Sequence, residues 1–433
     1  MWWLYFSIFS CQRADKTVSQ ELDGLDIQNV DLSFNIETLN ASATINLQTS
    51  QDSIVLSAKE IIIQKVFQNS VEVDFLQENA VLTLENSSHS LQELEIHYTF
   101  PERSLWQFDG WMPNQGISFI WPDYCGNLYP CNPNTQDGII FTMDVSGVPE
   151  GQMAIFTPDS IGQAPPYMPA IAMGEYTHLH VGTSDSGIDV SAWYLDGVAG
   201  LEEAEYGVWN MVESLNFMEE VYGPYLYGKH IGTVEVDWGA DSYGGMEHHP
   251  FFHVGKYDFW NEEAQIHELA HGWFGDAVRL ECWEDFVLSE GTVTYMTAKT
   301  LQEVAGYDLW EYYVSEFLIP ICEGEDYNAL VMPDGCNDID FENDNLWSLA
   351  TYMKGACFYE EVGDIIGEEV IDQVISEFYF AHKGQSATME DMLALLDSYA
   401  TPDQKIQIAQ SIQDWLRQEA CPTDYANRCL YRD

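Results

Sequence analysis

The chain has 433 residues, enough for two or three domains, and its apolar content of 46% is typical of a globular protein with buried cores. It carries 15 Lys and Arg against 71 Asp and Glu, which gives a formal net charge of -56. Such a surface repels phosphates and anionic headgroups, so the composition excludes nucleic acids and anionic membrane surfaces as partners. We expect a monomer.

The N-terminus reads MWWLYFSIFSCQRADK, an apolar run that ends at Cys11. This pattern resembles a bacterial lipoprotein signal, in which the cysteine becomes the lipidated first residue. We therefore expect residues 1–11 to be an export signal and Cys11 to be a lipid anchor. The protein is then periplasmic, attached to the cell surface, or extracellular. No other stretch reaches the roughly 18 apolar residues that span a bilayer.

From about residue 28 to 100, apolar residues alternate with polar ones. One run contains Val30, Leu32 and Phe34, and similar runs lie at 43–47 and 94–98. A period of two predicts strands with one buried face and one solvated face. Comparable short segments continue to about residue 190, separated by breaks rich in Asn, Ser and Gly. We predict a β-rich domain over residues 20–197.

Near residue 200 the pattern changes to helical spacing. Val208, Met211 and Leu215 lie on one side of a predicted helix, which Gly223 and Pro224 end. The segment IGTVEVDW then has the character of a strand, and helices dominate the rest of the chain. We predict a second, mostly helical domain over residues 198–433, and hence the α+β class.

The segment NEEAQIHELAHGWFGD points to a metal. His267 and His271 are four residues apart, so a helix places both imidazoles on one face, where they can bind one ion. Glu290 follows after eighteen intervening residues and supplies a third ligand from the next helix. Three protein ligands with a fourth position for water are typical of catalytic zinc. The pattern is that of a gluzincin, and we predict one Zn²⁺ per chain.

Glu268 stands between the two histidines and cannot point at the metal with them, but it can face the bound water. Zinc lowers the pKa of that water to about 7, and a nearby carboxylate then accepts its proton during attack on a carbonyl. Glu268 is therefore the predicted general base. The tetrahedral intermediate also requires an oxyanion donor besides the metal.

Two further segments complete a resemblance to a known family. In GGMEHHPFF, Glu247 is separated from the metal motif by nineteen intervening residues, and TYMKGACFYEEV contains Tyr352. With the metal motif, these segments resemble the zinc aminopeptidases of the aminopeptidase N and leukotriene hydrolase family, over residues 200–420 and more weakly over 28–195. The resemblance implies an all-β, saddle-like N-terminal domain followed by a thermolysin-like, mostly helical catalytic domain, in a short two-domain form.

The resemblance also implies roles for the GGMEH segment. Glu247 would bind the free α-amino group of the substrate, which places the first peptide bond over the metal site. Gly244 and Gly245 would let the backbone approach an extended peptide. Met246 and His248 complete this substrate-binding segment, and His248 stands where the family has Asn.

Two more residues receive roles from the resemblance. Tyr352 would donate a hydrogen bond to the oxyanion. In the first domain, FIWPDYCGNLYPC replaces the segment near which the family places a second amine-binding side chain, and Gln115 is the candidate for that role.

Eight cysteines remain when Cys11 is set aside, and an even number suits disulfides in an oxidising compartment. Close spacing favours three pairs and leaves a fourth by difference: Cys125–Cys131, Cys322–Cys336, Cys421–Cys429 and Cys282–Cys357.

The predicted protein is thus a zinc-dependent aminopeptidase, an exopeptidase that removes single residues from peptides with a free N-terminus. Two alternatives stay open. A thermolysin-type endopeptidase shares the metal motif but lacks the amine-binding segment. A catalytically inactive surface-binding protein would keep the fold without turnover. An epoxide hydrolase of the leukotriene branch needs a lipid pocket that the sequence does not show. The preferred N-terminal residue is not determined by the sequence.

Overall fold

The computed structural model describes residues 24–104, 110–120, 124–157, 159, 161–195, 197, 200–239, 242–324, 330–336 and 348–430. The chain forms two compact units. The β-rich unit comprises residues 1–180, 191–207 and 227–260, and the helical unit comprises 181–190, 208–226 and 261–433. The predicted export signal, including Cys11, lies outside the described residues. The boundary predicted at 197/198 stays a prediction.

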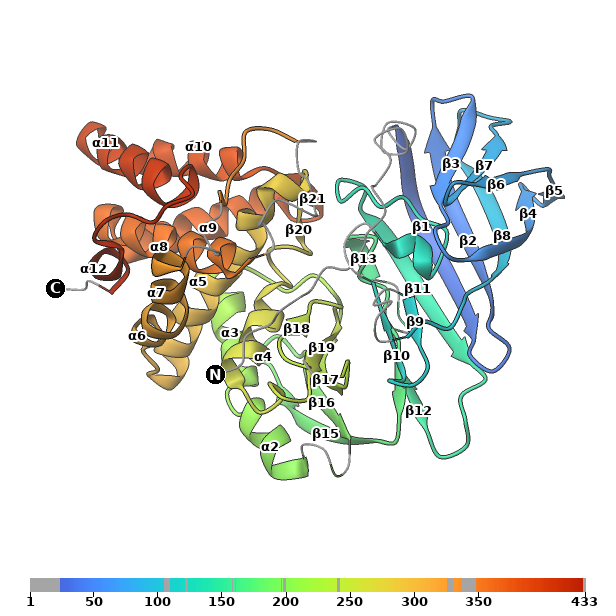
Figure 1. Ribbon diagram of the computed structural model, residues 1–433, viewed down its shortest axis with the longest axis horizontal. Helices are drawn as coiled ribbons and strands as arrows, with labels where there is room; N and C mark the ends of the chain where they lie inside the picture. The colour runs from blue at the N-terminus through green and yellow to red at the C-terminus, as the bar shows by residue number, and fades with distance from the viewer. Residues whose placement is uncertain are drawn as a thin grey trace. The chain divides into compact units, whose positions relative to one another are not determined.

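Two sheets are built mainly from the first hundred residues. One has seven strands in the order β13 (Ile161–Ala164), β11 (Ile139–Ser146), β1 (Leu25–Asn35), β2 (Asn40–Thr49), β8 (Gln92–Thr99), β4 (Ile62–Gln68) and β5 (Val71–Glu72). The other has three strands, β3 (Ser53–Ser57), β7 (Val81–Glu85) and β6 (Leu76–Glu78). The long strands β11, β1, β2 and β8 lie side by side (Figure 1).

The alternating pattern of the sequence produces the buried face of this seven-stranded sheet. Val30, Leu32 and Phe34 of β1 are at most 3% exposed, and the apolar residues of β2 and β8 are buried in the same way. The register brings them together, because Val30 pairs with Ile45, which in turn pairs with Leu94. The predicted strands in this region are confirmed.

Two further sheets follow in the chain. One has four strands in the order β12 (Met153–Ile155), β14 (Ala172–Gly174), β10 (Ile117–Phe119) and β9 (Gly110–Met112). The other has five strands, β15 (Tyr176–Thr183), β16 (Asp189–Leu195), β17 (His230–Val236), β19 (Phe251–Gly255) and β18 (Gly245–Met246). This last sheet positions the GGMEH segment, whose first strand β18 is an edge strand.

Helices dominate the chain after residue 260. Their bounds, with α2 and α3, are α2 (Gly200–Gly207), α3 (Met211–Val221), α4 (Glu262–Ala270), α5 (Phe286–Ala305), α6 (Trp310–Tyr312), α7 (Ile319–Glu323), α8 (Leu349–Ile366), α9 (Glu368–His382), α10 (Met389–Tyr399), α11 (Pro402–Ser411) and α12 (Tyr425–Leu430). Short 3₁₀ turns are η1 (Cys125–Asn127) and η2 (Trp283–Asp285), and π-helical segments are η3 (Tyr313–Leu318) and η5 (Ile412–Leu416). Strands β20 (Val278–Leu280) and β21 (Gln385–Ala387) form a small parallel sheet. The predicted α+β class is confirmed.

The helix predicted after residue 200 is interrupted. It forms as α2 and α3, with a break at 208–210. At the end of α2 a Cβ atom on Gly207 would lie 2.1 Å from the carbonyl oxygen of Phe259, so this position requires glycine. Met211, Leu215 and Met218 are fully buried on α3, as the helical spacing predicts.

Only one of the four predicted disulfides forms as predicted. Cys125 pairs with Cys131, whereas the other pairs are Cys282–Cys336, Cys322–Cys421 and Cys357–Cys429. The predicted Cys322–Cys336, Cys421–Cys429 and Cys282–Cys357 pairs are wrong, because helix packing and not sequence proximity decides which cysteines meet. Cys357 is buried in α8, which packs against α12, where Cys429 is also buried. Among the described residues, no helix is both long enough and apolar enough to cross a membrane.

Candidate metal centre

Three predicted ligands converge in the helical unit. Asn261 caps α4 by accepting a hydrogen bond from the backbone N–H of Glu263, and this helix carries His267 and ends at His271. Nε2 of His267 lies 3.1 Å from Oε2 of Glu290 on α5. Nε2 of His271 lies 3.4 Å from the same oxygen and 3.3 Å from Nε2 of His267. The three atoms therefore form a nearly equilateral triangle.

This triangle has the size that zinc requires. Ligand atoms arranged as a tetrahedron at about 2.05 Å from zinc lie about 3.3 Å from one another. The observed separations of 3.1 to 3.4 Å match that edge length. Two imidazoles and one carboxylate are also a ligand set typical of catalytic zinc, in which the fourth position takes water. The donor set fits a zinc ion.

The ring of His271 is held in the orientation that a ligand needs. Its Nδ1 donates a hydrogen bond to the carbonyl oxygen of Phe274 at 3.0 Å, so that Nε2 faces Glu290 and His267, as a metal ligand would require. Ser289 Oγ lies 3.4 Å from the same Nδ1. Gly275, at φ +99°, makes this possible, because a Cβ atom there would lie 2.8 Å from Nδ1 of His271. The sequence interpretation missed Gly275, although the GD dipeptide after the motif marks a turn.

Glu290 is ionised in this environment. Burial would raise the pKa of its carboxyl, but the charges of His271 and His267 and the hydrogen bonds from both lower the pKa to about 2. The side chain is only 7% exposed. The histidine protons thus stabilise the buried carboxylate when no metal is present, and a bound cation would take their place beside it.

Two other predicted residues lie in the same helical unit. Glu268 follows His267 on α4 and is 5% exposed. Tyr352 lies on α8, and its ring stacks on the imidazole of His267, with centroids 5.8 Å apart and an interplanar angle of 24°. Phe286 at the start of α5 contacts the edge of the same tyrosine ring. The tyrosine ring is thus packed between His267 and Phe286.

Paired glycines bring Tyr352 near the ligands. A Cβ atom on Gly291 would lie 2.8 Å from the Cα of Gly355, so α5 and α8 meet backbone to backbone at these positions. Gly291 follows Glu290 directly, and Gly355 lies three residues after Tyr352. Lys354 lies between Tyr352 and Gly355 in the sequence. Its buried side chain donates hydrogen bonds to the carbonyl oxygens of Gln418 and Glu419. Lys354 and Gly355, which follow the tyrosine, therefore hold α8 in place through hydrogen bonds and close packing.

The GGMEH segment belongs to the β-rich unit. Gly245 and Met246 form β18, which pairs antiparallel with β19. Gly244, at φ +70°, accepts a hydrogen bond from the N–H of Gly255 and donates its own N–H to Asp258 Oδ2 at 2.7 Å. Bonded and non-bonded pairs alternate in an antiparallel ladder, so the N–H and C=O of Gly245 point to the free edge of the sheet. Among the described residues no strand pairs with that edge.

Glu247 and His248 follow this edge strand. Glu247 is 9% exposed, and its carbonyl oxygen accepts a hydrogen bond from the N–H of His249. His248 is 2% exposed, and its ring lies 5.1 Å from that of His253 and 6.1 Å from that of Phe119. Burial lowers the pKa of His248, and the neighbouring His253 and His249 lower it further. His248 is thus a neutral imidazole.

Gln115 lies in the turn between β9 and β10. Its N–H donates a hydrogen bond to the carbonyl oxygen of Met112. Its Oε1 is buried and has no hydrogen-bond partner among the described residues. The next strand, β10, carries the Phe119 ring that contacts His248. Gln115 thus lies in the turn before the strand whose Phe119 ring contacts the GGMEH segment, and its role stays a prediction.

Comparison with solved structures identifies the fold. The chain is similar to a two-domain M1 zinc metallopeptidase in a mutant form bound to L-tryptophan, with a TM-score of 0.76 at 18% identity, covering 92% of this chain and 96% of that one. The M1 zinc metallopeptidase of Deinococcus radiodurans gives 0.74 at 19% identity, with coverage of 92% and 96%. Native leukotriene A4 hydrolase from Saccharomyces cerevisiae gives 0.75 at 18% identity, covering 92% of this chain and 69% of that one.

Sequence comparisons point the same way. Residues 256–415 match the Peptidase family M1 domain. Leucine aminopeptidase 2 of Emericella nidulans is 25% identical over 281 residues, 58% of this chain and 40% of that protein. Leucine aminopeptidase 2 of Neurospora crassa is 23% identical over 437 residues, 87% of this chain and 60% of that protein. The chain thus spans about half the length of these relatives.

Proposed function

We propose that the chain is a zinc-dependent aminopeptidase, because residues 256–415 match the Peptidase family M1 domain and the fold is similar to that of a two-domain M1 zinc metallopeptidase. It removes single residues from peptides with a free N-terminus. The observation that carries the proposal is the triangle of His267, His271 and Glu290, whose ligand atoms are 3.1 to 3.4 Å apart. One zinc ion per chain fits there.

The residues around this site divide the chemistry among them. Zinc, when bound, acts as a Lewis acid toward the peptide carbonyl and makes water more acidic. Glu268 accepts the proton of the attacking water and passes it to the departing amine. The hydroxyl of Tyr352 donates a hydrogen bond to the oxyanion that develops on the carbonyl oxygen. Stacking on His267 keeps the tyrosine ring in place for this contact.

Glu247 makes the enzyme an exopeptidase in this proposal. Its carboxylate binds the substrate's ammonium group, so that only the first peptide bond can react. The free N–H and C=O of Gly245 pair with the peptide backbone as an added strand, between Gly244 and Met246. Neutral His248 lines the same segment without adding a positive charge that would repel the ammonium group. Gln115 supplies a further polar contact to the amine.

Two matched substrates test this proposal. We expect the leucine amide of a fluorogenic amine to be cleaved at least ~100-fold faster than its N-acetylated form. Leucine is the first choice because the relatives above are named leucine aminopeptidase 2. Preference for the acetylated substrate would indicate an endopeptidase instead. A protein that binds zinc but shows no turnover on a broad aminoacyl panel would be an inactive binding protein.

Two variants assign the roles of the glutamates. Glu268→Gln should lower kcat by ~10²–10⁴ while zinc content stays unchanged. Glu247→Gln should lower kcat/KM for the free-amine substrate and leave little discrimination against the acetylated one, again with zinc retained. Glu213→Gln, an exposed position on α3, is the matched control and should behave as wild type. Loss of zinc in either active-site variant would contradict the assigned role.

We also propose that the protein is an exported monomer with a lipid on Cys11. The four disulfides support an oxidising compartment. Mass spectrometry of the N-terminal peptide from the membrane fraction should show a diacylglyceryl-modified cysteine, and Cys11→Ser should move the protein to the soluble fraction. An unmodified N-terminus would contradict the lipid anchor. Analytical ultracentrifugation of that Cys11→Ser protein should give a single species near the 49.3 kDa chain mass.

A further inference from the structure

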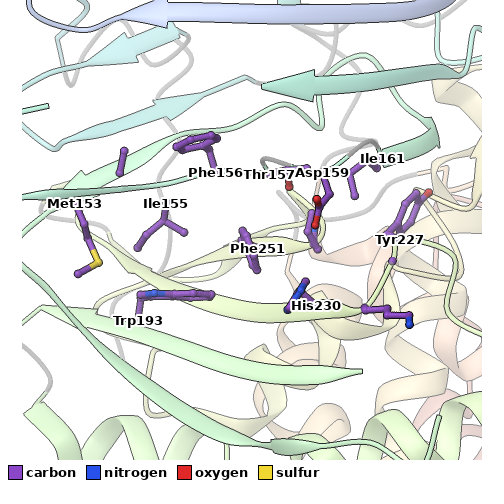
Figure 2. A pocket seen from close by; sticks show the side chains of 14 residues that line it. Met153, Ile155, Phe156, Thr157, Asp159, Ile161, Trp193, Tyr227, His230 and Phe251 are labelled. Carbon is purple, nitrogen blue, oxygen red and sulfur yellow. The ribbon is translucent and has the colours of Figure 1, made fainter. Parts of the chain in front are cut away.

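The β-rich unit contains a pocket that plays no part in the proposed reaction. It has a volume of about 440 Å³ and lies between the segment around β12 and β13 and the sheet that contains β16, β17 and β19 (Figure 2). Small-molecule sites in proteins typically have volumes of ~300–1,000 Å³. The pocket therefore has room for a ligand somewhat larger than one amino acid.

One end of the pocket is apolar. Figure 2 shows Met153 and Ile155 there, with Trp193 below them and Phe251 toward the middle. The rings of Trp193 and Phe251 are 4.8 Å apart in an edge-to-face arrangement, which fixes both. Met153 is 40% exposed, so apolar surface here is still available to a ligand. This end suits a large aliphatic or aromatic side chain.

The other end of the pocket is charged. Asp159 and His230 lie there in Figure 2, and Lys229 also lines the pocket. None of these three side chains makes an ion pair or hydrogen bond with another described residue. In contrast, Lys256 pairs with Asp237 at 2.6 Å, as expected in a chain with 15 cations and 71 acidic residues. One acid and one lysine that face the same cavity without bonding each other leave both charges for a ligand.

We propose that this pocket binds a free α-amino acid with a large apolar side chain. The ammonium group of such a ligand is attracted to Asp159, and its carboxylate to Lys229 and His230. An α-amino acid carries one charge of each sign, which matches a pocket lined by both an aspartate and a lysine. The side chain then extends toward Trp193 and Phe251. This assignment goes beyond the proposed peptidase reaction, although the ligand class coincides with the product of that reaction.

The pocket is connected to the GGMEH segment through the residues that follow Glu247 in the chain. Pro250 and Phe251 line the pocket and lie three and four residues after Glu247. Their place is fixed by the sheet, because the N–H of Gly232 on β17 donates to the carbonyl oxygen of Pro250 at 2.9 Å. An amino acid that orders this stretch would change the affinity of the Glu247 segment for an amine, and the coupling is reciprocal.

Calorimetric titration of the full chain with L-leucine and L-phenylalanine tests the proposal. We use the Glu247→Ala background, so that binding of the amino group at that residue does not contribute. Saturable binding is expected for both amino acids. L-leucinamide, N-acetyl-L-leucine and glycine lack the carboxylate charge, the ammonium charge or the side chain, and each should bind at least ~10-fold more weakly. Equal binding of all five compounds, or no saturable binding, would overturn the proposal.

Variants locate the site. Lys229→Met and Asp159→Asn should each weaken leucine binding at least ~10-fold. Lys65→Met, at an exposed position on β4, is the matched control and should leave binding unchanged. Both pocket variants change exposed side chains, and thermal unfolding checks that they fold. Leucine binding that survives both pocket variants places the amino acid elsewhere and overturns the assignment. Peptidase activity is measured separately, so its absence would count against the proposed function and not against this site.

Discussion

Two histidine pairs in this chain have nearly the same ring geometry but different chemistry. The rings of His267 and His271 are 4.9 Å apart at 79°, and those of His248 and His253 are 5.1 Å apart at 82°. Within the part of the chain that the structure describes, only the first pair has a carboxylate, Glu290, within hydrogen-bond distance of a ring nitrogen. Two neighbouring imidazoles are therefore not enough for a metal centre, which also needs an anionic ligand and a fixed ring orientation.

The sheet register explains why the second pair lacks a carboxylate. Val234 of β17 pairs with His253 of β19, and Glu235 pairs with Val254. Side chains alternate between the two faces of a sheet, so buried Glu235 lies on the face opposite to His253. Burial lowers the pKa of His253 to about 3, which keeps the ring neutral. The second pair is thus a buried, uncharged element of the core.

Removing the carboxylate of Glu290 should leave His267 and His271, like His248 and His253, without an anionic partner. Glu290→Gln keeps the shape of the side chain but removes its charge, and we expect zinc affinity to fall more than ~100-fold, with peptidase activity falling in parallel. Competition with a chromogenic chelator measures the affinity. Glu303→Gln, later on the same helix and exposed, should bind zinc as wild type does. Unchanged affinity in Glu290→Gln would show that the triangle is not the metal site.

Disturbing the ring orientation without touching a ligand should have a smaller effect. In Gly275→Ala the new Cβ lies 2.8 Å from Nδ1 of His271, so the ring must rotate or its hydrogen bond to Phe274 must lengthen. We expect zinc affinity to fall ~10–100-fold, the usual effect of losing an outer-shell partner. Gly162→Ala controls for the substitution itself, because a Cβ atom there meets nothing within 4 Å. Wild-type affinity in Gly275→Ala would mean that the ring orientation is set elsewhere.

These two cases show what the sequence could predict. The convergence of His267, His271 and Glu290 could be predicted because helical periodicity and the zinc ligand set leave a pattern in the sequence. Gly275 and the Gly291–Gly355 contact could not, since a close approach of two backbones depends on how distant segments pack. The disulfides involving Cys322, Cys357 and Cys429 failed for the same reason. Strands such as β1 and β2 were predictable because their burial follows a local period of two.

The neutral pair of His248 and His253 should make the stability of the fold decrease in acid. The pKa of His253 is lowered to about 3 in the folded state, against ~6.5 in the unfolded chain. Stability from this residue is therefore present above pH ~6.5 and is lost as the pH falls below it. Between pH ~7.5 and ~5 the loss should reach about 2 kcal/mol, and His253→Leu should remove this part of the pH dependence. Urea unfolding of both proteins at several pH values measures it, and identical pH dependence would contradict a buried neutral ring.

Glu235, on the opposite face of the sheet from His253, should make the stability of the fold decrease as the pH rises. Burial raises the pKa of Glu235 to about 7, although the N–H of Leu195, which donates to Oε2 at 2.8 Å, partly lowers it. Oε1 is buried and has no hydrogen-bond partner among the described residues. A raised carboxyl pKa stabilises the fold below the unfolded value of ~4.3, and this contribution is lost as the pH rises through ~7.

Glu235→Gln should therefore separate the two faces of the sheet by the sign of their pH dependence. The amide is neutral at every pH and can still accept the hydrogen bond from Leu195. From pH ~6 to ~8 the wild type should lose about 1 kcal/mol more stability than the variant, because only the wild type must ionise a buried group. Glu93→Gln, an exposed position on β8, controls for the loss of one negative charge from the chain. If Glu235→Gln and Glu93→Gln change the pH dependence equally, the effect comes from net charge, and the buried carboxyl is not the titrating group.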